Sequence, residues 1–181
     1  MEYFDIVDSQ GRPTGEKKLR ADVHRDGDWH RAVDMWLINK KDEILIQKRT
    51  PTKESYPNLW EVSSSGHISS GETTISAAVR EFTEELGLEI TADDLEFLFE
   101  VEEMHVTNNG KFLNNEIKDV YLVTRDCKIS DIHFQESEIA EVRFMKLPEL
   151  EKAIKDNPEL FVPHEKCYTK SFDIFRERLA P

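Results

Sequence analysis

Three glutamates near the middle of the chain have the residue type and the spacing to hold a divalent cation. Glu81, Glu84 and Glu85 lie three and four positions apart, so a helix would set their carboxylates on one side, within an arc of about 100°. Like charges at this spacing destabilise an isolated helix by roughly 0.2–0.5 kcal/mol per pair. A hard cation such as Mg2+ would remove that repulsion, because it prefers carboxylate oxygens together with the oxygens of a phosphate.

The residues around these glutamates predict the helix that would position them. The opposite side carries an apolar stripe formed by Ile75, Val79, Phe82 and Leu86. Thr73 or Thr74 can cap the N-terminus, and Gly87 suits the left-handed position just after the last turn. The three glutamates alone would equally fit the solvated face of an ordinary amphipathic helix. The spacing of the residues around them is needed to distinguish that face from a metal-binding one.

That wider spacing extends over residues 66–88, which read GHISSGETTISAAVREFTEELGL. This stretch resembles the Nudix box at every defining position. The resemblance implies an α/β fold, namely an α/β/α sandwich around a central mixed β-sheet. In that fold the box forms a loop–helix–loop that holds a divalent metal against a diphosphate, and Glu72 would support the loop.

The resemblance also implies roles for individual residues of the box. Glu84 and Glu85 would be the chief metal ligands, together with the carbonyl oxygen of Gly66. Glu81 would be either another ligand or the base that takes a proton from water. Arg80 would orient the carboxylates. The metal is expected to be Mg2+ or Mn2+.

Segments outside the box narrow the resemblance to one branch of the family. Residues 20–33 (RADVHRDGDWHRAV) and 47–67 (QKRTPTKESYPNLWEVSSSGH) are similar to isopentenyl-diphosphate isomerase and to the isomerase-like Nudix hydrolases. In the isomerase, basic residues that match Arg20, Arg49 and Lys53 grip a diphosphate. Guanidinium and ammonium groups suit phosphate oxygens, although cations on a loop are often merely solvated.

The same resemblance points to four further candidate residues. Histidines that match His24, His30 and His67 help to hold metal in the isomerase, and a glutamate that matches Glu116 belongs to its active centre. Histidine is a common metal ligand but also fits structural hydrogen bonding, so both roles stay open for these residues. Glu116 would complete the metal site or accept the proton from water.

Departures from the isomerase pattern favour hydrolysis. The isomerase needs a cysteine just before the Gly-His pair, and this chain has Ser65 there, with no activating neighbour evident in the sequence. Asn114 replaces a carboxylate, and Glu81 stands where the isomerase has a basic residue. We expect hydrolysis of a diphosphate linkage in a nucleoside diphosphate derivative or another organic diphosphate. The alternatives are an isomerase-type enzyme and a non-catalytic diphosphate-binding module.

Composition bounds the partners and the compartment. The length of 181 residues fits one domain over residues 1–181. The net charge of −13 argues against binding a nucleic acid polymer or an anionic membrane. Cys127 and Cys167 form no CxxC pair, so two reduced thiols are expected. The N-terminus lacks the apolar run of a signal peptide, and nothing has the length of a transmembrane segment. We therefore expect a cytoplasmic protein with a small-molecule substrate.

Hydrophobic patterning predicts the remaining elements. Strands are expected at residues 3–7, 32–38, 43–47, 59–62, 95–106, 116–124 and 141–147, and a helical turn near 20–23. Residues 32–38 and 43–47 should pair as one hairpin, and 95–106 and 116–124 as another. Helices are expected from Pro148 to about Asp156 and over about 164–179. The aromatic stripe of the last helix, Tyr168, Phe172 and Phe175, indicates core or a homodimer contact.

Overall fold

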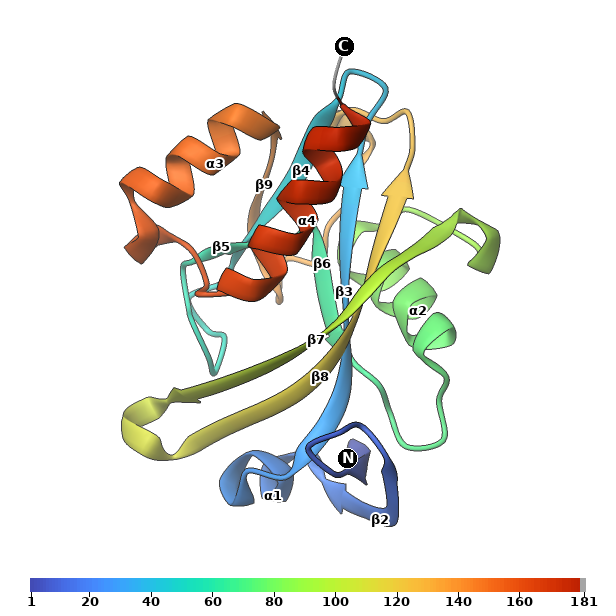
Figure 1. The fold of residues 1–181 in the computed structure, drawn as a ribbon, viewed down its shortest axis with the longest axis vertical. Helices are drawn as coiled ribbons and strands as arrows, with labels where there is room; N and C mark the ends of the chain where they lie inside the picture. The colour runs from blue at the N-terminus through green and yellow to red at the C-terminus, as the bar shows by residue number, and fades with distance from the viewer. Residues whose placement is uncertain (180–181) are drawn as a thin grey trace.

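A mixed β-sheet with helices on both faces forms the protein, whose computed structural model describes residues 1–179 (Figure 1). The strands are β1 Tyr3–Val7, β2 Pro13–Leu19, β3 Trp29–Ile38, β4 Glu43–Arg49, β5 Trp60–Glu61, β6 Ser64–His67, β7 Leu95–Thr107, β8 Phe112–Thr124 and β9 Ile139–Lys146. The α-helices are α1 Arg20–Asp26, α2 Thr74–Leu86, α3 Leu147–Asp156 and α4 Glu165–Arg178. The predicted α/β class with a central mixed sheet is confirmed.

Strand β3 is the centre of the sheet. It runs parallel to β8 from the pair Trp29–Asn115 to the pair Ile38–Thr124, and antiparallel to β6. Strand β7 continues the sheet beyond β8 as a long antiparallel hairpin. Parallel pairing brings residues far apart in sequence into register, so that His30 faces Glu116.

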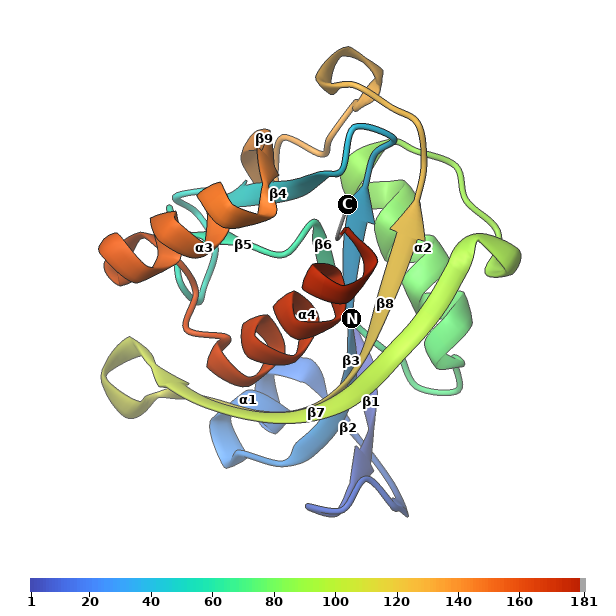
Figure 2. The ribbon, with the colours of Figure 1, turned by 45° about the horizontal axis from the view of Figure 1, so that its top comes forward.

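Alternation along β3 builds two cores, one on each face of the sheet. Val33, Met35 and Leu37 pack with Phe82 and Leu86 of α2, whereas Trp36 and Ile38 pack on the other face with residues of α3 and α4. Figure 2 shows α2 and α4 on opposite sides of β3. The sheet therefore separates α2 from the C-terminal helices.

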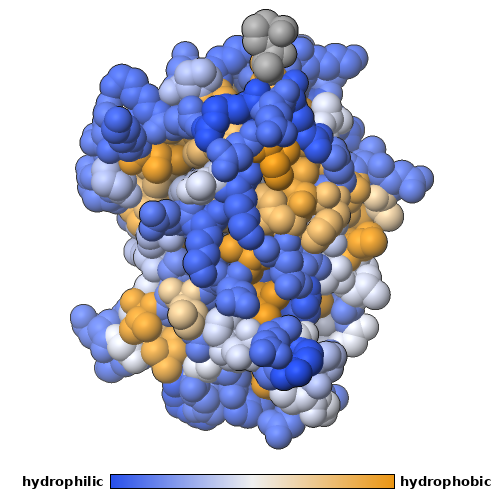
Figure 3. Space-filling model, viewed as in Figure 1, coloured by the Kyte–Doolittle hydropathy of each residue, from blue (hydrophilic) through white to orange (hydrophobic). Residues whose placement is uncertain are grey.

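The aromatic stripe of the C-terminal helix belongs to the core. Tyr168, Phe172 and Phe175 are buried and surround the Trp36 ring at 5.7–6.1 Å between ring centroids. The stripe therefore packs inside the protein and is not available for contact with a second copy. A homodimer stays a prediction, and no surface is assigned to it. Figure 3 shows mostly polar residues on one face, with apolar residues gathered beside α4 and at the β7–β8 hairpin.

Two local predictions need correction. Residues 32–38 and 43–47 flank a turn, but β3 and β4 pair only beside it, at Ile38 and Ile44, because β4 takes β9 as its partner instead. Ile75 was expected in the buried stripe of α2 but is 46% exposed, because the small side chains of Ala77 and Ala78 make the close contact with the sheet. Within the described residues, no helix is long and apolar enough to cross a membrane.

Candidate active site

Capping and packing fix the helix of the Nudix box. Thr73 is its N-cap, with the Thr73 hydroxyl accepting from the Ser76 amide at 3.2 Å, and Gly87 ends it at φ +66° in the left-handed region. Phe82 and Leu86 are fully buried under the sheet. Because this face of α2 packs in the core, the glutamates on the other side of the helix line a cavity.

This cavity, about 400 Å³ in volume, lies against α2. It collects most of the residues singled out from the sequence: Arg20, Arg49, Lys53, Gly66, His67, Arg80, Glu81, Glu84, Glu85 and Glu116. They come from helix α2, from strands β4, β6 and β8, and from the start of α1 and the loop after β4. His24 and His30 are not among the lining residues, and their rings contact the ring of His67 at 5.4 and 5.3 Å between centroids.

The three glutamates differ sharply in environment. Glu85 is buried, and its Oε2 accepts from the Ser64 hydroxyl at 2.7 Å and the Ser65 amide at 3.1 Å. Burial raises the pKa of Glu85 to about 8, and burial likewise raises the pKa of Glu81. Glu84 is more than half exposed. The carboxylates of Glu81 and Glu85 are close together and shielded from water, and their oxygens are donors that a divalent cation would fit.

Arg80 joins the helix to the loop before it. Its guanidinium donates to both oxygens of Glu72, at 3.0 and 2.9 Å, and to the carbonyl oxygen of His67 at 3.1 Å. A further bond of 2.7 Å reaches Glu81, and Glu84 lies 3.5 Å away. Arg80 therefore fixes one edge of the carboxylate group and ties it to the strand that carries Gly66.

The three basic residues expected to bind phosphate are paired with carboxylates in this structure. Arg49 donates to Glu61 at 2.7 Å and to the Ser55 carbonyl oxygen at 3.0 Å. Although burial alone would raise it, Arg49 lowers the pKa of Glu61 to about 2. Arg20 lies 3.0 Å from Glu2, and Lys53 contacts Glu138. An entering anion would therefore exchange with these carboxylates.

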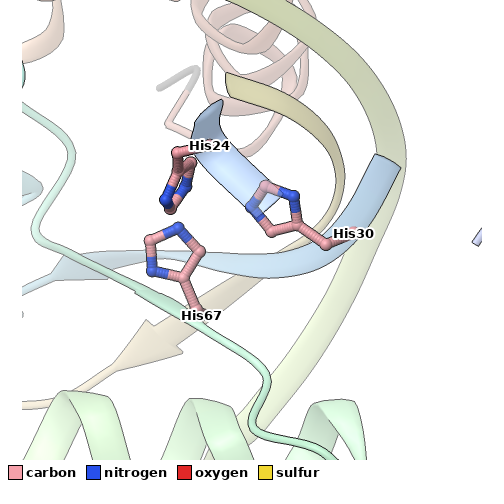
Figure 4. A group of neighbouring side chains, drawn as sticks. All are labelled: His24, His30 and His67. Carbon is pink, nitrogen blue, oxygen red and sulfur yellow. The ribbon is translucent and has the colours of Figure 1, made fainter. Parts of the chain in front are cut away.

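The three candidate histidines converge from three elements, as Figure 4 shows. One ring nitrogen of each lies within 4.8 Å of the others. The Nε2 atoms of His24, His30 and His67 are buried and have no hydrogen-bond partner among residues 1–179. His30 Nδ1 lies 3.1 Å from the Asp28 carbonyl oxygen; donation there leaves a lone pair on Nε2.

Glu116 lies against this histidine cluster. Its Oε1 is 3.1 Å from His67 Nε2 and 3.7 Å from His30 Nε2, without the alignment of a hydrogen bond. Burial lowers the pKa of His24 to about 4 and that of His67 to about 3, so these imidazoles are neutral. Burial also lowers the pKa of His30. Three imidazoles, with the Glu116 carboxylate beside two of them, are a donor set for a transition metal.

A buried network around Lys118 is not predicted by the sequence patterns. Lys118 Nζ lies 3.3 Å from Asp34, 3.3 Å from Glu103 and 3.4 Å from Glu116. Although burial opposes the charge, these carboxylates raise the pKa of Lys118 well above its usual range. The one available signal was Asp34 itself, a charged residue inside the apolar run AVDMWLI.

Ser65 has a neighbour that the sequence did not reveal. Its hydroxyl donates to Asp34 Oδ1 at 2.7 Å, a contact that no local pattern around Ser65 indicates. Burial raises the pKa of Asp34. The two residues are 31 positions apart and meet because β3 and β6 pair.

Comparisons with known proteins agree with this geometry. A family model described as the NUDIX domain matches residues 28–165. Nudix hydrolase 3 of Arabidopsis thaliana is 40% identical over 98% of this chain, which spans only 24% of that relative's length. An isopentenyl-diphosphate Delta-isomerase of Escherichia coli is 28% identical over 90% of this chain and 86% of its own. The crystal structure of DR0079 from Deinococcus radiodurans matches with a TM-score of 0.65 and 25% identity, covering 86% of this chain and 90% of that one.

Together, the fold, the carboxylate-lined cavity and the matched family model define the class of protein. The chain belongs to the Nudix hydrolase family. The resemblance to its isomerase-like branch is also confirmed, since isopentenyl-diphosphate isomerases are relatives over most of the chain.

Proposed function

We propose that this protein hydrolyses a diphosphate linkage in a nucleoside diphosphate derivative or another organic diphosphate, with Mg2+ or Mn2+. The observation that carries the proposal is the cavity, where the box carboxylates face the basic residues Arg49 and Lys53. Oxygen donors suit a hard cation and guanidinium and ammonium groups suit phosphate oxygens. One cavity therefore has donors for both the metal and the diphosphate.

Each group of residues has its own part in this chemistry. Glu81, Glu84, Glu85 and the Gly66 carbonyl oxygen would hold the cation, which when bound would supply positive charge against the charge developing on the phosphoryl group. Arg20, Arg49 and Lys53 would hold the non-reacting phosphate oxygens. Arg80 keeps the carboxylates in place through Glu72.

Either Glu81 or Glu116 would accept the proton of the attacking water. Glu81 lies on α2 under Arg80, and Glu116 lies on β8 beside Lys118. The two glutamine variants separate them, because loss of the base lowers kcat with little change in metal affinity, whereas loss of a ligand weakens the metal. Metal titrations of activity in both variants make the assignment.

The histidine cluster supports a second metal position. The buried Nε2 atoms of His24, His30 and His67, which have no hydrogen-bond partner among the described residues and lie beside Glu116, are suited to a borderline metal such as Zn2+. Elemental analysis of the purified protein tests this. His24→Ala should lower the bound metal, whereas the matched variant of the exposed His133 should leave it unchanged.

A screen of organic diphosphates tests the reaction itself. Nucleoside diphosphate sugars, dinucleoside polyphosphates and isopentenyl diphosphate are incubated with Mg2+ or Mn2+, and both phosphate release and proton exchange at carbon are measured. Metal-dependent cleavage of a diphosphate supports the proposal. Proton exchange without cleavage would assign isomerase chemistry instead, and tight binding of every diphosphate without turnover would assign a binding module.

A further inference from the structure

A second group of metal-ligand side chains shares the Lys118 ammonium with Glu116, the carboxylate beside the histidine cluster. Glu103 and His105 are on β7, and His164 immediately precedes α4. One donor atom of each lies within 4.8 Å of the others. His105 and His164 line the cavity, while Glu103 is buried behind them.

The distances in this group centre on Glu103 Oε2. This oxygen is 3.4 Å from His105 Nε2 and 2.5 Å from His164 Nδ1. Donor atoms around a tetrahedral Zn2+ are separated by roughly 3.4 Å, given bonds of about 2.0–2.1 Å. The His105 contact already has that separation. The His164 contact is shorter because a proton bridges it, and it needs to open by roughly 1 Å.

The local charge favours a cation. Lys118 is the ammonium shared by Glu103, Asp34 and Glu116, so three carboxylates surround one positive charge. If Glu103 turned to a dication, Lys118 would keep two carboxylates as partners. His164 is 4% exposed and lies between Glu103 and Glu61. Although burial opposes the charge, these two carboxylates raise the pKa of His164 to about 9, so a metal bound at Nδ1 would displace the proton that Glu103 accepts.

We propose that Glu103, His105 and His164 form a binding site for a borderline transition-metal dication such as Zn2+. Two imidazoles and one carboxylate are a ligand set that Zn2+ uses when one position stays open. Because both imidazoles line the cavity, that open position faces the space for substrate. Mg2+ is a poor occupant, since it prefers an octahedron of oxygens, so the site is chemically distinct from the carboxylates of α2.

Cobalt serves as the visible probe of this site in the full-length protein, at a saturating background of Mg2+. We expect wild type to bind Co2+ with an absorption spectrum of nitrogen and oxygen coordination. His105→Ala should lose one equivalent of Co2+, and Glu103→Gln should weaken that equivalent at least about tenfold. His133→Ala is the matched control with full binding, and His24→Ala reports on the other histidine cluster separately.

A ligand swap keeps the test decisive if removal of a side chain perturbs folding. His105→Cys replaces one donor by another and should add a thiolate-to-cobalt charge-transfer band at unchanged stoichiometry. Wild-type Co2+ binding by both His105→Ala and Glu103→Gln would overturn the proposal. So would the absence of a new band in folded His105→Cys. Neither readout depends on hydrolysis, so failure of the metal-site proposal is distinguishable from failure of the proposed function.

Discussion

Gly66 lies so close to Glu81 that a side chain at position 66 has no room. A Cβ built on Gly66 would fall 2.1 Å from Glu81 Cδ and 2.2 Å from its Cγ. Contacts below about 3 Å do not occur between such atoms, so either the helix or the carboxylate would have to move. The absence of a side chain here is what lets strand β6 bring its backbone against the carboxylates of α2.

Replacing Gly66 by alanine should therefore damage the site more than the fold. We expect a fall in stability of about 1–3 kcal/mol and, because Glu81 is displaced, a larger loss in activity, of the order of 10²-fold. Urea unfolding and steady-state kinetics measure the two effects. The control is Gly71→Ala, at φ +82° with nothing within 4 Å of its Cβ, which should lower stability while sparing kcat. Equal activity losses in both variants would contradict this reading.

Glu85→Gln tests the buried carboxylate. The change keeps the shape and removes the charge, so kcat should fall by about 10²-fold or more if the carboxylate stabilises the transition state through a metal. Glu84→Gln should behave similarly. Glu89→Gln, at an exposed position beyond the helix, is the matched control and should retain full activity. Wild-type turnover of Glu85→Gln at saturating Mg2+ would remove the residue from the mechanism.

The pair of Arg49 and Glu61 should be structural as well as functional. Its side chains are 14% and 3% exposed. Arg49→Met leaves the buried carboxylate without its guanidinium partner, although Gln47 still donates to it at 3.3 Å, and should cost on the order of 3 kcal/mol of unfolding free energy. The double variant with Glu61→Gln should recover most of that stability. KM should be raised in both, because a phosphate-binding group is missing. Chemical denaturation and kinetics check the two halves, and unchanged KM would limit Arg49 to the structural role.

Phe175 tests the core on the face away from the site. It is fully buried and meets Trp36 edge to face at 5.7 Å, so Phe175→Ala should cost about 3–5 kcal/mol. Phe97→Ala, at a side chain 55% exposed, should change stability by less than about 0.5 kcal/mol. Thermal melting compares them. A loss of Mn2+ binding at the α2 carboxylates in a still-folded Phe175→Ala protein would be unexpected, since the sheet lies between α4 and α2.

Local patterns in the sequence predicted the elements whose signals are contained within a short stretch. The α2 caps Thr73 and Gly87 are such a signal, and so is the Asn109–Gly110 turn between β7 and β8. Strand β6 was missed because its sequence SSGH is short and polar. It forms because β3 offers it an edge, which no local pattern records.

The candidate site divides in the same way. The box residues follow one helix, so their mutual placement could be predicted from spacing. Lys118 and Glu103 come together only through the register of β7 on β8, and His164 joins them from the start of α4. Long-range register of this kind is set by tertiary packing, so the second ligand group was invisible in the sequence.

The most direct measurement is a crystal structure of the protein soaked in Mn2+, read by anomalous scattering. We expect a Mn2+ peak bounded by the carboxylates of Glu81, Glu84 and Glu85 and by the carbonyl oxygen of Gly66. A map with no peak between these groups, and with the three carboxylates turned away from one another, would contradict it.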